Sequence, residues 1–203
     1  MKRVSVDVDS VSFRQRIALF HATTVTASRA VLFSDEELKY DTFLASGVNS
    51  TNILVAGLTP TQLKARGFDS ASKMKSFGFD ALHFTNASFC NMMLLAYGRN
   101  DIIDSFLVTP QDAVSFAGSQ AIDILKISTK DLLERCVGFP SHSYAVLHQL
   151  AHGNSLKGVP ASLILDAGLR LKTLSKLGYT VESIVKNTDA SADQLLKMGF
   201  VLA

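Results

Sequence analysis

Three histidines that follow a cysteine come nearest to a catalytic or metal site in this 203-residue chain. Cys136 precedes His142, His148 and His152, and the last two are spaced to share one face of a helix. A thiol beside a histidine suits a nucleophilic enzyme, and such a histidine pair could bind zinc if a third ligand such as Asp166 joined it. No glutamate stands between the histidines as in the HExxH motif. A metal-dependent or Cys/His enzyme is therefore an alternative, against histidines that face solvent or pack between helices.

The sequence supports little other active-site chemistry. Cys90 and Cys136 lack the spacing of metal ligands, so both are expected to be small buried side chains in a reduced compartment. The glycines are too far apart to form a P-loop or a GxGxxG phosphate cradle. We therefore assign no catalytic, cofactor-binding or metal-binding residue, and we expect no cofactor.

Basic residues gather in two groups that could line one face of the molecule and contact phosphates. The net charge is only +2, with 20 basic and 18 acidic residues, which does not by itself predict nucleic-acid or membrane binding. A nucleic-acid-binding repeat protein is thus a second alternative, against basic side chains that simply face solvent. The candidate basic face consists of Lys64, Arg66, Lys73 and Lys75 in one group and Arg170, Lys172 and Lys176 in the other.

The positions of the glycines organise the rest of the chain. All of them except Gly153 fall on a series with a step of about ten residues or twice that, and such a fixed period is the signature of a repeat architecture. Alternate members of the series are glycine without exception, which indicates structural turn positions. These members are Gly57, Gly78, Gly98, Gly118, Gly138, Gly158, Gly178 and Gly199.

Each unit of the series has the start and stop signals of a short helix. Thr59, Asp69, Asp80, Thr109, Thr129 and Thr180 are expected N-caps, and all four prolines begin a unit, where a missing N–H costs nothing. The glycine ends the helix, and an apolar residue follows it. Because a helix this short is unstable alone, the units must stack. Residues 33–203 are therefore expected to form an all-α solenoid of about eight helical hairpins, each about 20 residues long.

Both ends of the chain depart from this pattern. Residues 1–32 lack the glycine series and are expected to form an N-terminal arm, with a β-strand at residues 3–8 in which apolar and polar residues alternate. The C-terminal tail is apolar, whereas terminal repeats normally have a polar outer face. Candidate interaction residues are therefore Val4, Val6 and Val8 in the arm and Phe200, Val201 and Leu202 in the tail.

Two stretches carry a resemblance to known repeats. Residues 68–79 and 191–200 resemble short helical repeats of the form F-[ST]-x-x-x-L-K-x-x-G-[FY], which occur in proteins of large DNA viruses, their protist hosts and some bacteria. The resemblance covers roughly residues 33–203 and is strongest at the two ends of that range. It implies an α-solenoid with a scaffolding or interaction role, and it carries no catalytic residues.

These observations favour a non-enzymatic structural protein that contacts other protein subunits in a large assembly, such as a virion or minor capsid component. No apolar run reaches the roughly 18 residues that a membrane span needs, and the N-terminus has no secretion signal. A cytoplasmic or virion location is the corresponding expectation.

Overall fold

The computed structural model of the protein describes residues 39–45, 48–55, 57–150 and 156–201, and every regular element in these ranges is a helix. The prediction of an all-α fold is confirmed for this part of the chain. The elements are α3 (Tyr40–Ala45), α4 (Ser50–Val55), α5 (Pro60–Ala65), α6 (Ala71–Ser76), the 3-10 helix η2 (Ala81–Thr85), α7 (Ala87–Tyr97), α8 (Arg99–Phe106), α9 (Pro110–Ala117), α10 (Ala121–Leu125), α11 (Thr129–Arg135), α12 (Pro140–Leu150), α13 (Ala161–Asp166), α14 (Leu171–Lys176), α15 (Val181–Asn187) and α16 (Ala192–Met198).

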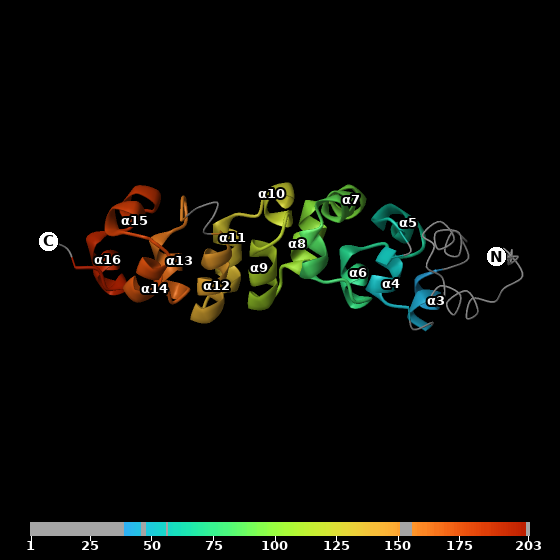
Figure 1. Cartoon of the computed structure of the whole chain (residues 1–203), viewed down its shortest axis with the longest axis horizontal. Coiled ribbons are helices and arrows are strands. Elements are labelled where there is room, and N and C mark those ends of the chain that lie inside the picture. The colour runs from blue at the N-terminus through green and yellow to red at the C-terminus, as the bar shows by residue number, and fades with distance from the viewer. Residues whose placement is uncertain (1–38, 46–47, 56, 151–155, 202–203) are drawn as a thin grey trace, which may run out of the picture.

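The helices follow one another along the long axis of the molecule in chain order (Figure 1). Helices α3 to α5 lie towards one end and α14 to α16 towards the other. In the described residues, no helix combines the length and the apolar character that a bilayer crossing requires. The predicted arm at residues 1–32, its strand with Val4, Val6 and Val8, the boundary at residue 33 and the tail residue Leu202 lie outside the described residues.

Several of the short helices end in the way that the glycine series predicts. After α5, the N–H of Gly67 donates to Lys64 and the N–H of Phe68 donates to Leu63, at 3.1 Å each. This pair of bonds is the Schellman motif, and the buried side chains of Phe68 and Leu63 supply the apolar contact that accompanies it. The same two bonds end α6, α13, α14 and α16, where the apolar residues are Phe79, Leu169, Tyr179 and Phe200.

Seven of the eight glycines assigned to turns have a positive φ, which a residue with a side chain adopts only at a cost. Gly118 is the exception, with φ −93° and ψ 7°. A Cβ atom on Gly118 would collide with the side-chain amide of Gln149, which lies on α12. Because these atoms are the far end of a flexible, exposed side chain that can move aside, neither backbone conformation nor packing requires glycine at this position.

The helix starts also follow the expected pattern, with two shifts of one residue. Ser70 rather than Asp69 caps α6, and Asp69 instead pairs with Lys73 at 2.9 Å. Ser128 rather than Thr129 caps α11. In both cases the serine hydroxyl accepts the main-chain N–H three residues later, as an N-cap does. The expected caps Thr59, Asp80, Thr109 and Thr180 are confirmed.

Helices stack mainly on the third element along the chain. The pairs in contact include α5 with α7, α6 with α8, η2 with α9, α7 with α10, α9 with α12 and α13 with α16. Hydrogen bonds follow the same spacing. A carboxylate oxygen of Asp101 accepts the N–H of Ala71 at 3.0 Å, 30 residues away, and one of Asp189 accepts the N–H of Ala161 at 2.7 Å, 28 residues away. Each aspartate therefore satisfies a free N–H at the start of a helix in the neighbouring layer.

This spacing differs from the predicted hairpin of about 20 residues. A stack of two-helix hairpins would place each helix on the second helix along, as α9 lies on α11 and α11 on α13. The thirty-residue contacts are more numerous along the chain and carry the hydrogen bonds between layers. The glycine period marks where each helix stops, but the angle that each turn sets decides which helices meet.

One continuous apolar core runs from Phe43 to Phe200. Its first half is rich in aromatic rings, and Phe84 lies at the centre of three of them, with ring centroids 5.1 Å from Phe106, 5.4 Å from Phe116 and 5.8 Å from Phe89. After Phe116, the described part of the core consists mainly of aliphatic side chains, with Phe200 as an aromatic residue at its end. Full burial of residues 90–97, which their apolar composition suggests, is not observed, since the side chain of α7 residue Leu95 is 85% exposed.

Candidate anion-binding cleft

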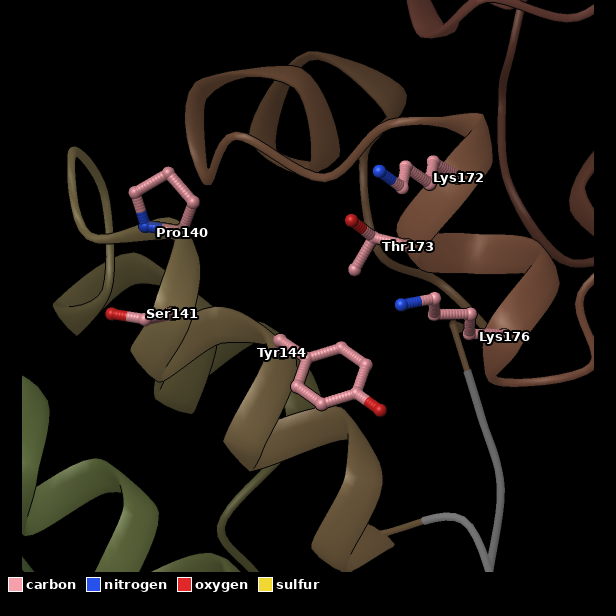
Figure 2. A pocket seen from close by; sticks show the side chains of 6 residues that line it. All are labelled: Pro140, Ser141, Tyr144, Lys172, Thr173 and Lys176. Carbon is pink, nitrogen blue, oxygen red and sulfur yellow. The ribbon is translucent and has the colours of Figure 1, made fainter.

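A cleft of about 420 Å³ lies between the start of α12 and the length of α14. Figure 2 shows its two walls, with Lys172, Thr173 and Lys176 projecting from α14 towards α12. The ring of Tyr144 faces them from α12, and its hydroxyl lies on the side of the ring nearer to α14. The residues that line the cleft are Pro140, Ser141, Tyr144, Lys172, Thr173 and Lys176.

The local sequence of α14 explains why its polar side chains share one wall. Lys172 and Lys176 are four residues apart, and Thr173 lies three residues before Lys176, so the three lie on adjoining positions of a helix. Leu174 is fully buried on the opposite side and fixes the helix against the core. On α12, Ser143, Val146 and Leu147 are buried, which turns Tyr144 towards the cleft.

The turn between α13 and α14 holds the two walls together. Gly168 has φ +74°, and its Cα lies so close to Pro140 that an added Cβ would be 2.9 Å from the Pro140 Cβ and closer still to its Cγ. The N–H of Gly138, just before α12, donates to the carbonyl of Asp166 at 3.3 Å. These two contacts hold the start of α12 beside the turn between α13 and α14, at one end of the cleft.

The lining of the cleft has two positive charges and no carboxylate. Within the described part of the chain, neither Lys172 nor Lys176 has an ion-pair or hydrogen-bond partner. The first residues of α12 add the positive end of a helix dipole. The hydroxyls of Thr173 and Tyr144 can donate hydrogen bonds, whereas the Ser141 hydroxyl points away from α14 and contacts His142 Nδ1 at 3.5 Å. The cleft is therefore suited to an anion.

The side chains of the other predicted basic residues have hydrogen-bond or ion-pair partners within the protein. Lys64 donates to the carbonyl of Ala96 at 2.6 Å and lies over the ring of Tyr97, with Nζ 5.3 Å from the ring centroid. Arg66 is buried and donates to the carbonyl of Gln62 at 2.9 Å. Arg66 therefore does not belong to an exposed basic face, and this part of the prediction is wrong.

The remaining members of the first basic group, Lys73 and Lys75, also lie beside carboxylates. Lys73 pairs with Asp69, and their hydrogen bond raises the pKa of Lys73, while Lys75 lies 3.4 Å from a carboxylate oxygen of Asp112. In the second group, Arg170 donates to two main-chain carbonyls just before it in the chain. Helices α5 and α6 are also separated from α14 by α7 to α12 along the long axis (Figure 1). The structure thus brings together only Lys172 and Lys176, and it does not join the two groups into one stripe.

The histidines near Cys136 do not assemble a site in the described residues. His148 packs beside the ring of Tyr144, His142 beside that of Phe139, and His152 lies outside the described residues. The described residues contain no group of three or more His, Cys, Asp or Glu side chains that could hold a metal ion. Of the described tail residues, Phe200 is buried in the core and Val201 is 87% exposed.

Both cysteines are buried, as expected, and burial raises the pKa of the Cys90 and Cys136 thiols to about 11. Since the thiolate is the reactive form, we expect neither thiol to react with iodoacetamide at pH 8 in the native protein, over a time in which the urea-unfolded chain is fully alkylated. Mass spectrometry of the intact chain checks this result. Rapid native alkylation of Cys136 would instead favour the nucleophilic-enzyme alternative.

The raised pKa values of the two thiols also make the free energy of unfolding depend on pH. The contribution of the protonated thiols to this free energy is complete below pH 9 and is lost as the pH rises through 11.

No protein-family model, curated protein or solved structure matches the chain. What the cleft can bind therefore follows from its own geometry and charge. The sequence singles out Lys172 and Lys176 but neither Tyr144 nor Thr173. Thr173 shares a helix face with Lys172 and Lys176, and Tyr144 lies one helical turn after Pro140. These spacings indicate a common site only once α12 is known to face α14.

Proposed function

We propose that the protein is a non-enzymatic α-solenoid that presents an extended surface to other proteins and works as a scaffold in a larger assembly. The observation that carries this proposal is the spacing of contacts between layers. Bonds such as Ala71 to Asp101 and Ala161 to Asp189 recur at about 30 residues, so three short helices would complete one turn of the solenoid. A solenoid built in this way would present a long surface from a small chain.

The composition of that surface supports protein partners. Large apolar side chains are exposed at intervals along the chain, on η2, α7, α15 and α16, in the turns before α9 and α12, and in the segment after α16. Polar or charged residues stand between successive members of this set in the sequence, so they do not form one apolar run. The side chains that are more than half exposed include Leu82, Leu95, Val108, Phe139, Val185, Leu196 and Val201.

Panning of a displayed peptide library against the immobilised full chain tests the scaffold proposal without a known partner. We expect the enriched peptides to converge on one sequence pattern and to bind the full chain in solution with dissociation constants of about 1–100 μM, as modest interfaces do. Isothermal titration calorimetry measures these constants. Enrichment that never converges, or peptides that bind the urea-unfolded chain equally well, would contradict the proposal.

A further inference from the structure

We infer that the cleft between α12 and α14 binds a phosphoryl group carried by a segment of a protein partner. This inference rests on the proposed scaffold function and assigns one docking site to it. The site consists of Lys172, Lys176, Thr173 and Tyr144, on the frame that Gly168 and Pro140 hold.

The charge of the cleft matches a phosphomonoester better than a carboxylate. A phosphorylated side chain carries a charge of about −1.5 to −2 at neutral pH and three acceptor oxygens. The ammonium groups of Lys172 and Lys176 would neutralise that charge, because no carboxylate lines the cleft. The hydroxyls of Thr173 and Tyr144 supply further donors for the remaining oxygens. A single carboxylate would leave one of the two ammonium groups without a counter-charge.

The size of the cleft indicates that the phosphoryl group arrives attached to something larger. Its volume of about 420 Å³ lies in the range of sites for drug-sized ligands, roughly 300–1,000 Å³, and exceeds what a bare phosphate ion fills. The Tyr144 ring and Pro140 supply apolar surface beside the lysines. A few peptide residues on either side of a phosphoserine or phosphothreonine would use that surface.

The cleft is held open without a ligand, which lowers the entropic cost of binding. The close approach of Gly168 to Pro140 and the hydrogen bond from Gly138 to Asp166 fix α12 relative to α14. Lys172 and Lys176 need only adjust their side chains. Their neighbours on the helix face supply no competing carboxylate.

A nucleic acid is the less favoured source of phosphate. Strong binding to a phosphate backbone needs several cationic contacts spread along it. Apart from Lys172 and Lys176, the basic residues that the sequence places in a phosphate-facing stripe are paired, buried or bonded to carbonyls. One isolated pair of lysines suits a single phosphoryl group.

Fluorescence anisotropy with the full chain tests this inference. The probes are a labelled degenerate peptide pool with phosphoserine at its centre, the same pool with serine, and a single-stranded oligonucleotide of equal charge. The variants are K172Q/K176Q and, as a matched control, K186Q, which removes an exposed lysine of α15 outside the cleft. Circular dichroism verifies that each variant is folded.

We expect the phosphoserine pool to bind at least about tenfold more tightly than the serine pool, and K172Q/K176Q to abolish that preference. K186Q should keep the preference within about twofold, and inorganic phosphate should compete only at concentrations at least about a hundredfold higher than the peptide. The inference is overturned if K172Q/K176Q retains the preference, if the oligonucleotide binds more tightly than the phosphopeptide pool, or if inorganic phosphate binds as tightly as the peptide.

Failure of this inference is distinguishable from failure of the scaffold proposal. Equal binding of the two peptide pools removes the phosphoryl site but leaves a peptide-binding scaffold. Library panning that yields no convergent peptide contradicts the scaffold, and a cleft that then binds only inorganic phosphate would be a site for a free anion.

Discussion

Replacement of Phe84 by alanine is expected to lower the free energy of unfolding by about 3–5 kcal/mol, the cost of emptying a large site in a packed core. Phe84 is fully buried on η2, and its ring contacts those of Phe89, Phe106 and Phe116 on α7, α8 and α9. The cavity left by the Phe84 ring would lie between η2, α7, α8 and α9. Because each of these elements is held by its stacking on the others, no single short helix can move to fill it.

Urea titration followed by circular dichroism measures this loss. The matched control is Phe139→Ala, since Phe139 is 51% exposed and contacts only the edge of the His142 ring among the described aromatic pairs. We expect its cost to stay below about 1 kcal/mol, as for most surface substitutions. Similar losses for the two variants would show that the aromatic cluster does not hold η2 and α7 to α9 together.

Replacement of Gly168 by alanine is expected to cost about 2–5 kcal/mol through two separate effects. Alanine at φ +74° is strained by about 1–2 kcal/mol, and its Cβ would press on the Pro140 ring, an overpacking that typically costs about 1–3 kcal/mol. Because Pro140 lines the cleft, we also expect weaker binding of the phosphoserine pool.

Gly178→Ala separates the two effects. Gly178 has φ +81° and no atom within 4 Å of an added Cβ, so its substitution carries the backbone strain alone. The difference between the two urea titrations gives the cost of the contact with Pro140. Equal costs would indicate that α12 shifts freely, and that the turn at Gly168 does not fix the width of the cleft.

Local signals in the sequence predict most of the helix boundaries in the described residues. Thr59 and Thr180 start helices and Gly67 and Gly178 end them because each signal acts on main-chain groups within one turn. The stacking distance of about 30 residues could not be predicted in this way. It depends on the angle between consecutive helices, which the packing of side chains such as Phe84 and Leu174 decides.

The candidate site was predictable only in part for a related reason. Lys172 and Lys176 stand out in the sequence, but so do Lys64 and Arg66, which the structure places against main-chain carbonyls at helix ends. A basic residue near the end of a short helix has free carbonyls within reach. Whether a lysine faces solvent or a neighbouring layer follows from the stacking, and a charge pattern does not reveal it.

The stacking of many helices on the third one along the chain constrains how the protein can change its length. Loss of one unit of about ten residues would place these helices opposite the wrong neighbours, and it would separate Asp189 from the helix start that it caps. Removal or duplication of three consecutive units would restore the same neighbours. Variation in size, in evolution or by engineering, is therefore tolerated in steps of three helices rather than one.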